Sequence, residues 1–267
     1  MGPKFHKSPA YYLVAWSILL IGVIVLVKLA MTELTSPAFL YSDDYVEYWS
    51  AARLNLSGGN PYDPEQLAPL QLAAGRTRDV PLMMWNPPWT LTLLMPLSWL
   101  PYSLSRLLWL LLSVLILFLA ANWGWYTYGG DPAKRWLAWL VVFTFSPSLH
   151  LLRFGQITLL LLLGVIGFLH FVKGERWWLA GAAAALITIK PHLLYLFGFA
   201  FVVWAVDRRK WTLLGGFVFS VVGALGIAWA VNLIRQYFYA VTTYPPEQWA
   251  TPTLGAILRL CCRRRLR

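Results

Sequence analysis

The chain has 267 residues, of which 59% are hydrophobic and only 12% are charged. A soluble domain is about 45–50% apolar and about 25% charged. The composition therefore excludes a soluble protein and predicts an all-α integral membrane protein. The net charge of +11 does not predict nucleic-acid binding, because Lys and Arg fall in short clusters between apolar runs, as in the cytoplasmic loops of membrane proteins.

The first apolar run, residues 11–31, predicts a transmembrane signal anchor. It is long enough to span a bilayer, basic residues precede it, and no small-residue cleavage site follows it. We therefore expect residues 1–10 to stay in the cytoplasm. The next segment, 32–86, holds seven of the eleven acidic residues, and we expect it to form a large loop on the outer, periplasmic or extracellular face.

Part of this outer loop, "DYVEYWSAARL", has the pattern of an amphipathic helix. Tyr45, Tyr48, Trp49 and Ala52 recur at spacings of three and four. This pattern suits a helix that lies along the membrane interface. The turn residues "SGGNPYDP" are expected to end it.

Two carboxylates, Asp43 and Asp44, stand at the start of that helix. An acidic pair in a solvated loop is usually only solvated. The aromatic residues that follow give these two a surface that can stack on a sugar, and a carboxylate there can deprotonate an acceptor hydroxyl as general base.

Residues 87–231 read as the transmembrane bundle. The stretch 88–125 is long enough for two spans, but Pro96, Pro101 and Arg106 interrupt it. One crossing, preceded by a short broken or re-entrant segment, keeps the later basic loops inside. With further spans expected at about 136–150, 156–172, 177–189, 192–206 and 212–231, the sequence predicts about seven or eight transmembrane helices.

The carboxyl-terminal segment, 232–267, is expected to be an outer loop followed by the start of another span. The chain ends "CCRRRLR" where an apolar run should continue, which predicts a truncated or frameshifted product. Cys261 and Cys262 are adjacent and have no metal-ligand spacing.

Ionisable residues near the spans are candidates for function. In "LITIKPHLLYL", Lys190 and His192 flank Pro191 on the expected outer side. Lys190 suits a phosphate and His192 can assist; the alternative is a snorkelling Lys beside a helix-breaking Pro.

A second group of polar residues stands before the span expected at 156–172, on the same expected outer side. In "SPSLHLLRFGQITLLLLLG", His150, Arg153 and Gln156 follow at helical spacing. Gln156 can bind a sugar hydroxyl and Arg153 a phosphate. A polar cap on a helix end is an equally good explanation.

The ordered set "DDYVEYWSAARLNLSGGNPYDP", "NPPWTLTLLMPLSWLP", "FGQITLLLLLG", "ALITIKPHLLYL" and "DRRKW" resembles glycosyltransferase family 87, from about residue 40 to 260. This is a GT-C class family of polytopic bacterial enzymes that includes polyprenyl-phosphate-mannose-dependent mannosyltransferases. The resemblance implies a GT-C-like helical bundle. Family members are usually longer, with several more spans, which puts the activity of this chain in question.

The resemblance also implies roles for residues. The family's Asp, three residues, Tyr pattern falls on Asp44 and Tyr48, so Asp44 is the expected catalytic base and Asp43 its alternative. Gly155-Gln156 matches the family's Gly-Gln element, and Lys190-Pro191, followed by His192, is expected to contact the lipid phosphate.

The implied reaction moves a sugar, expected to be mannose, from a polyprenyl-phosphate donor to a glycolipid or polysaccharide acceptor. It takes place on the outer face of the cell membrane, inverts the anomeric carbon, and needs no metal or cofactor beyond the lipid-linked sugar. No Asp-x-Asp motif is present.

A secondary transporter, or a polysaccharide flippase or assembly component, is the alternative function. A transporter is expected to have paired elements in two similar halves, and no internal repeat is visible. The transporter and the enzyme predict different locations for the polar residues. An enzyme requires Asp44, Gln156 and Lys190 to come together at the outer face.

Overall fold

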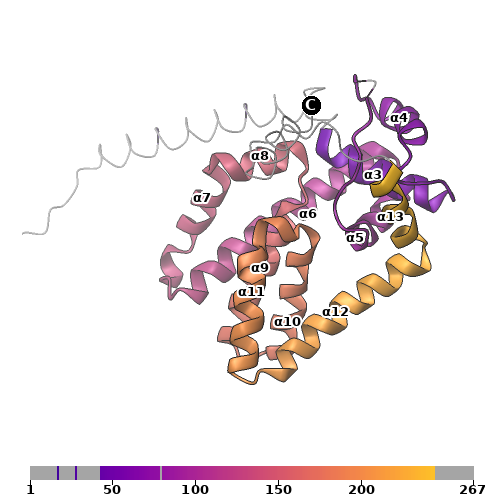
Figure 1. Ribbon diagram of the computed structural model, residues 1–267. Helices are drawn as coiled ribbons and strands as arrows, with labels where there is room; N and C mark the ends of the chain where they lie inside the picture. Colours follow the sequence, from indigo (N-terminus) through magenta and orange to yellow (C-terminus); the bar gives the residue numbers. More distant parts are fainter. Residues whose placement is uncertain (1–16, 18–27, 29–42, 79, 244–267) are drawn as a thin grey trace, which may run out of the picture.

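The computed structural model describes residues 43–78 and 80–243, together with the isolated positions 17 and 28, and throughout the described residues the regular structure is helical (Figure 1). The predicted span at 11–31 and the segment 244–267 lie outside these residues, apart from the two isolated positions. The α-helices and short 3₁₀ helices (η) follow in this order: α3 (Asp43–Leu56), α4 (Pro64–Ala73), α5 (Trp89–Ser98), α6 (Tyr102–Thr127), η1 (Pro132–Lys134), α7 (Trp136–Thr144), α8 (Ser146–Phe154), α9 (Thr158–Lys173), α10 (Trp177–Ala185), η2 (Leu186–Ile189), α11 (Pro191–Asp207), α12 (Trp211–Ala230) and α13 (Leu233–Thr243).

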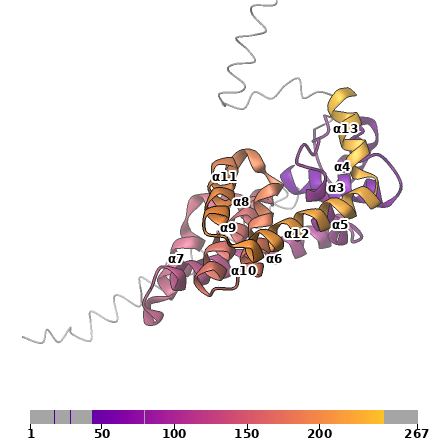
Figure 2. The same ribbon diagram turned by 60° about the horizontal axis from the view of Figure 1, so that its bottom comes forward.

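The helices form two neighbouring groups. α3, α4, α5 and α13 gather at one end, and both Figure 1 and Figure 2 show α12 running from the group of α10 and α11 to this cluster. In the second group, α9 packs against α6 and α10, and α10 packs against α12. The helices that the sequence assigned to a loop, α3 and α4, are thus packed against the rest of the described helices through α5 and α6.

Two described helices are long and apolar enough to cross a membrane, α6 with 26 residues and α12 with 20. The pair formed by Pro132–Thr144 and α8 passes the same test as one span bent by 58°. α9 and α11 have 16 and 17 residues, which falls short of the roughly 20 that a bilayer core requires. The all-α membrane class is therefore confirmed, whereas the described residues supply two or three clear spans where the sequence predicts seven or eight for the whole chain.

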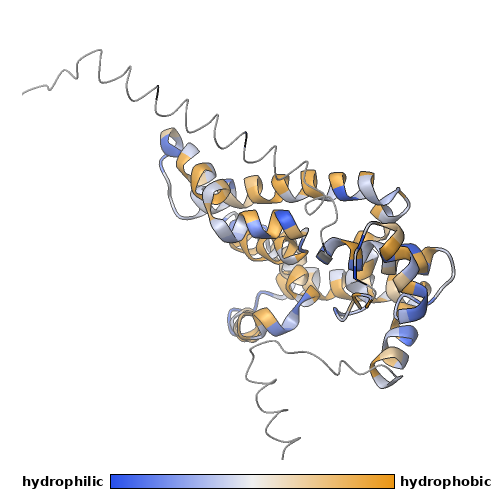
Figure 3. Cartoon of the chain, turned by 90° about the horizontal axis from the view of Figure 1, so that it is seen from above, coloured by the Kyte–Doolittle hydropathy of each residue, from blue (hydrophilic) through white to orange (hydrophobic). Residues whose placement is uncertain are grey.

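The distribution of apolar side chains is that of a protein dissolved in lipid. α6 exposes Leu107 and Leu111 but buries Ser105, Arg106 and Ser113 against its neighbours. Figure 3 shows that hydrophobic residues dominate the long helices, with hydrophilic residues mainly at the helix ends and in the loops. A surface helix of a soluble protein instead buries its apolar side chains and exposes its polar ones.

Within the stretch 88–125, one helix, α6, is long and apolar enough to cross a membrane, and the single crossing stays a prediction. α5 is about 15 Å long, half of a bilayer core, and ends before Pro101, which stands at the start of α6. The span expected at 136–150 is broken at Phe145. Pro147 explains the break, because its ring would clash with the carbonyl four residues earlier in a continuous helix.

The helix predicted within residues 32–86 is present as α3, and its aromatic face packs against other helices of the chain. Tyr45 shares a 2.6 Å hydrogen bond with Ser105 Oγ and stacks on Trp109 with ring centroids 5.8 Å apart. Trp49 Nε1 donates to the carbonyl of Leu100 at 3.1 Å. The aromatic face of α3 is therefore buried against α5 and α6, and the position of this helix at the membrane interface stays a prediction.

α4 and α13 complete the cluster around α3. Asp63 caps α4 by accepting from the backbone N–H of Glu65 at 3.0 Å, a standard start before Pro at the first turn. α13 begins at Leu233, where the sequence analysis expected a loop. The Tyr237 ring packs edge-on against the Tyr62 ring, with centroids 5.5 Å apart, so α13 is held to the segment between α3 and α4.

Candidate functional site

A chain of hydrogen bonds joins three of the predicted residues. Gln156 Nε2 donates to Asp44 Oδ2, Thr158 Oγ1 donates to Gln156 Oε1 at 3.2 Å, and Lys190 Nζ donates to Thr158 Oγ1 at 3.3 Å. Each donor points toward the carboxylate. The chain therefore has an ammonium at one end and a carboxylate at the other, and it links α3 to the start of α9 and the junction between η2 and α11.

Gly155 explains why Gln156 reaches Asp44. It ends α8 in the left-handed region, with φ +64°, which glycine adopts without strain. A Cβ at this position would lie 2.7 Å from Tyr45 Cβ and 3.2 Å from Arg106 Cζ. The Gly-Gln pair is thus a turn that brings the α8–α9 junction directly onto α3.

Arg106 fixes the same junction from the side of α6. Its Nη2 donates to the carbonyls of Leu152 and Arg153 at 3.0 and 2.8 Å. These are among the last carbonyls of α8, where a positive charge also stabilises the helix dipole. Trp109 Nε1 donates to Gly155 O at 2.9 Å. Arg106, one of the residues that interrupt the apolar stretch 88–125, therefore positions the α8–α9 junction.

The start of α5 holds the segment that carries Lys190. Trp89 Nε1 donates to Thr188 Oγ1 at 3.2 Å, and Thr90 Oγ1 donates to the carbonyl of Ile189 at 3.4 Å. Lys190 itself is partly buried and stands in a non-helical conformation before Pro191. Because Pro191 begins α11, the η2 helix ends here and the ammonium turns toward Thr158.

Glu47 is a site residue that the sequence analysis missed. It lies one turn after Asp44 on α3 and therefore on the same helix face. The pKa of Glu47 is raised to about 8, mainly by burial and to a smaller extent by the negative charge of Asp44, while Lys190 and Arg76 oppose the shift. The carboxyl group thus lies within electrostatic reach of both ends of the hydrogen-bond chain. Its spacing of three residues from Asp44 was the available signal.

Tyr48 adds a hydroxyl to the same side of α3. Burial raises the pKa of Tyr48 well above its usual value, with a smaller contribution from the charge of Glu47. Asn86 Nδ2 donates to the Tyr48 hydroxyl at 3.3 Å. Asn86 comes from the "WNPPW" stretch, so this segment and the start of α5 contact both Tyr48 and the Lys190 junction.

A buried amide supports α3 from the other side. Gln71 of α4 donates to Ser50 Oγ at 3.0 Å and to the carbonyl of Leu82 at 2.8 Å. Its Oε1 accepts from Arg76 Nη1 and from the Leu82 N–H, both at 2.8 Å. Unlike the Lys190 chain, this network lies within the outer loop and fixes Arg76 near Glu47.

The remaining predicted residues lie outside the hydrogen-bond chain. Arg153 is exposed, with Cζ 6.0 Å from the Phe154 ring centroid, and His150 packs on the same ring at 4.5 Å. His192 is exposed on the first turn of α11. Asp43 is the first residue of α3, and its side chain lies outside the described part of the structure.

The arrangement can do two things chemically. Asp44 is oriented by the amide of Gln156 and can take a proton from a hydroxyl. Lys190 supplies a positive charge that can bind a phosphate or stabilise a leaving group. Thr158, which connects them, was also missed by the sequence analysis, because a Thr at the start of an apolar helix looks like an ordinary cap.

Comparison with known proteins identifies a family. The sequence model of glycosyltransferase family 87 matches residues 85–265, more than half of the chain. No curated protein and no solved structure matches significantly. The matched range contains Gln156, Thr158 and Lys190, whereas α3 with Asp44 lies before it. By this match the chain belongs to glycosyltransferase family 87 and is a membrane glycosyltransferase.

Proposed function

We propose that the chain transfers a sugar, mannose in the first instance, from a polyprenyl-phosphate donor to a hydroxyl of a glycolipid or polysaccharide. Asp44 is the general base and Lys190 binds the donor phosphate. The observation that carries the proposal is the hydrogen-bond chain from Lys190 through Thr158 and Gln156 to Asp44. It joins a carboxylate and an ammonium in one cluster, which supports a base and a phosphate ligand acting together.

The reaction is a single displacement at the anomeric carbon. The acceptor oxygen forms the new C–O bond as the bond to the phosphate oxygen breaks, and the acceptor proton passes to Asp44. The electron pair leaves on the polyprenyl phosphate, whose added negative charge Lys190 stabilises. A single displacement inverts the anomeric configuration, and no cofactor besides the lipid-linked sugar takes part.

The charges of the described helices favour an outer location for this reaction. α6 begins beside Tyr45 of the Asp44 cluster and ends at Thr127, whose carbonyl accepts from Lys173 at 2.7 Å. The far end of the molecule carries the basic loops around Arg135, Lys173 and Arg208. Under the positive-inside rule, the basic end is cytoplasmic and Asp44 faces outward.

The test uses the full chain in membranes supplied with labelled polyprenyl-phosphate mannose. Asp44→Asn keeps an oxygen that accepts from Gln156 but removes the base, so transfer is expected to fall at least about 100-fold. Glu65→Gln, an exposed change in the same loop, is the matched control and is expected to keep full transfer. Transfer by Asp44→Asn at the wild-type rate would remove Asp44 as the base.

Lys190→Met tests the second role separately. Loss of the positive charge is expected to weaken donor binding and to slow departure of the phosphate. The value of kcat/KM for the donor should therefore fall strongly, while KM for the acceptor should change less. If the wild type moves no mannose, polyprenyl-phosphate glucose is supplied next. Uptake of a substrate across sealed vesicles without any transfer to an acceptor would instead support the transporter.

A further inference from the structure

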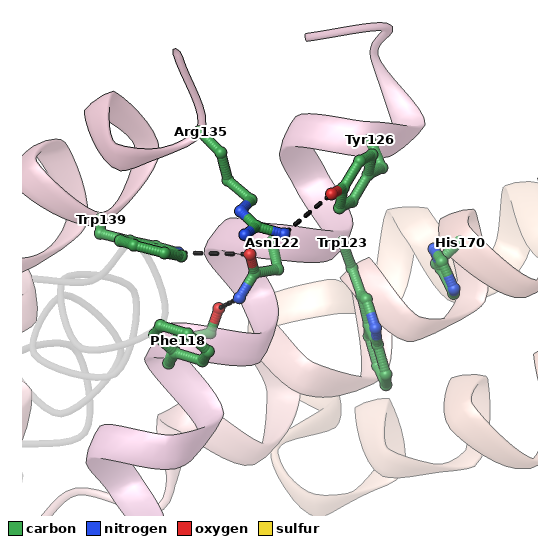
Figure 4. Close-up of a pocket in the computed structure, with 7 residues that line it drawn as sticks. All are labelled: Phe118, Asn122, Trp123, Tyr126, Arg135, Trp139 and His170. Atoms are coloured by element: carbon green, nitrogen blue, oxygen red, sulfur yellow. Dashed lines mark hydrogen bonds between the residues drawn. The ribbon is translucent and has the colours of Figure 1, made fainter. Parts of the chain in front are cut away.

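A pocket lies at the end of α6 far from Asp44, and the proposed reaction does not use it (Figure 4). Its volume of about 490 Å³ is in the range of sites that hold small ligands. The walls come from α6, from the start of α7 with the residue before it, and from α9. Aromatic side chains form most of them, and these are Phe118, Trp123, Tyr126 and Trp139.

Arg135 supplies the permanent charge of this pocket. Its Nη1 donates to the Tyr126 hydroxyl at 2.8 Å, and its Cζ lies 5.2 Å from the Trp139 ring centroid (Figure 4). A guanidinium carries five N–H donors in a planar fork, and among the described residues it forms no ion pair with a carboxylate. The fork is therefore held by stacking while donors remain for an anion.

The other polar group of the wall is already satisfied. Asn122 accepts from Trp139 Nε1 at 3.3 Å and donates to the carbonyl of Phe118 at 2.9 Å. His170 lies flat on Trp123, with centroids 5.0 Å apart and 8° between the planes. The wall thus presents aromatic faces and one guanidinium, which suits a ligand with one anionic group.

The surroundings of the pocket indicate a lipid. Lys173 donates to the carbonyls of Tyr126 and Thr127 at 3.0 and 2.7 Å, which places another cation beside the rim. Next to the pocket, α7 exposes Leu140 and Val141, at 49% and 62%. Trp and Tyr with basic residues at one end of a span are typical of the membrane surface, and basic pockets between helices on the cytoplasmic side bind anionic head groups.

We propose that this pocket binds the phosphate of an anionic membrane phospholipid. Arg135 holds the phosphate between the rings of Trp139 and Tyr126, and the acyl chains run along the exposed side chains of Leu140 and Val141. Lys173 adds long-range attraction. The site is separate from the Asp44 cluster and does not depend on the proposed reaction.

The experiment titrates phosphatidylglycerol into the purified full chain in a neutral detergent and follows the Tm. A ligand that binds the folded state raises the Tm with concentration, so we expect a saturable rise that phosphatidylcholine does not give. Arg135→Gln is expected to weaken the apparent affinity about tenfold or more, because a charge-assisted hydrogen bond is lost. Free inorganic phosphate at the same concentration is expected to give no rise, since it lacks the tails.

Matched variants separate this site from general attraction to the basic end. Arg208→Gln removes an exposed charge that pairs with Asp207 and is expected to keep the wild-type titration. If Arg135→Gln and Arg208→Gln weaken binding equally, or if Arg135→Gln titrates as the wild type does, the proposal is overturned. Should Arg135→Gln fold poorly, Arg135→Lys serves in its place; it keeps the charge but loses the fork, and unchanged affinity in that variant would equally overturn the assignment.

Discussion

Glu47, a further carboxylate of α3, changes the electrostatics of the candidate site. Asp44 and Glu47 lie on one face, and Lys190 and Arg76 act on Glu47 from other segments. Because the pKa of Glu47 is about 8, this group is mainly neutral near pH 7. Asp44, one turn earlier on the same face, is the carboxylate that accepts a hydrogen bond from the amide of Gln156.

This pKa predicts how stability depends on pH. Between the ordinary value of 4.5 and about 8, the folded chain holds a proton on Glu47 that the unfolded chain has lost, so the free energy of unfolding falls as pH rises through this window. The slope is at most about 1.4 kcal/mol per pH unit. Glu47→Gln is expected to flatten it, measured as the Tm of the purified protein from pH 5 to 9.

The control for this measurement is Glu65→Gln, because Glu65 is exposed on α4. It is expected to keep the pH dependence of the wild type. An identical slope in wild type and Glu47→Gln would show that the Glu47 carboxyl titrates at the same pH in both the folded and unfolded chain.

At the scale of elements, the packing of α10 on α12 depends on two glycines. A Cβ at Gly181 would overlap the carbonyl oxygen of Leu213, and one at Gly216 would overlap the carbonyl oxygen of Trp178. These are backbone atoms, so they cannot move aside as a flexible side chain does. Helix association in membranes relies on such close approach of small residues.

Gly216→Ala is therefore expected to destabilise the protein by about 1–3 kcal/mol, the usual cost of overpacking. Gly223→Ala on the same helix is the matched control, since nothing lies within 4 Å of a Cβ there. The control is expected to be neutral or slightly stabilising, because Ala favours helix over Gly. The Tm in detergent gives both values, and equal Tm for the two variants would contradict the close packing.

For the whole molecule, the arrangement of charges predicts its orientation. The Asp44 cluster and the basic loops lie at opposite ends of α6, which is about 39 Å long. With Cys261 and Cys262 changed to Ser, Ser57→Cys is expected to react with a membrane-impermeant maleimide in intact cells. Lys134→Cys is expected to react only after the membrane is opened. The reverse labelling pattern would place Asp44 in the cytoplasm and exclude an outer-face reaction.

Much of this protein follows from its sequence alone. Apolar runs and basic clusters determined the membrane class, and the basic loops that follow residue 125 predicted one crossing between 88 and 125. Periodicity determined that α3 is a helix. Such features depend on residues close together in the chain, where helical spacing and hydrophobicity act directly. The choice of Asp44, Gln156 and Lys190 as candidates rested on polar residues in apolar surroundings and on the family resemblance.

Only the tertiary structure decided what these residues touch. The aromatic face of α3 suits lipid and protein equally well by composition, and only α5 and α6 supply the surface that buries it. Glu47 and Thr158 join the site because Gly155 lets α8 and α9 turn directly against Tyr45. Contacts between residues more than 100 positions apart, such as Asp44 with Gln156, depend on how whole helices pack, and local sequence patterns carry no record of that.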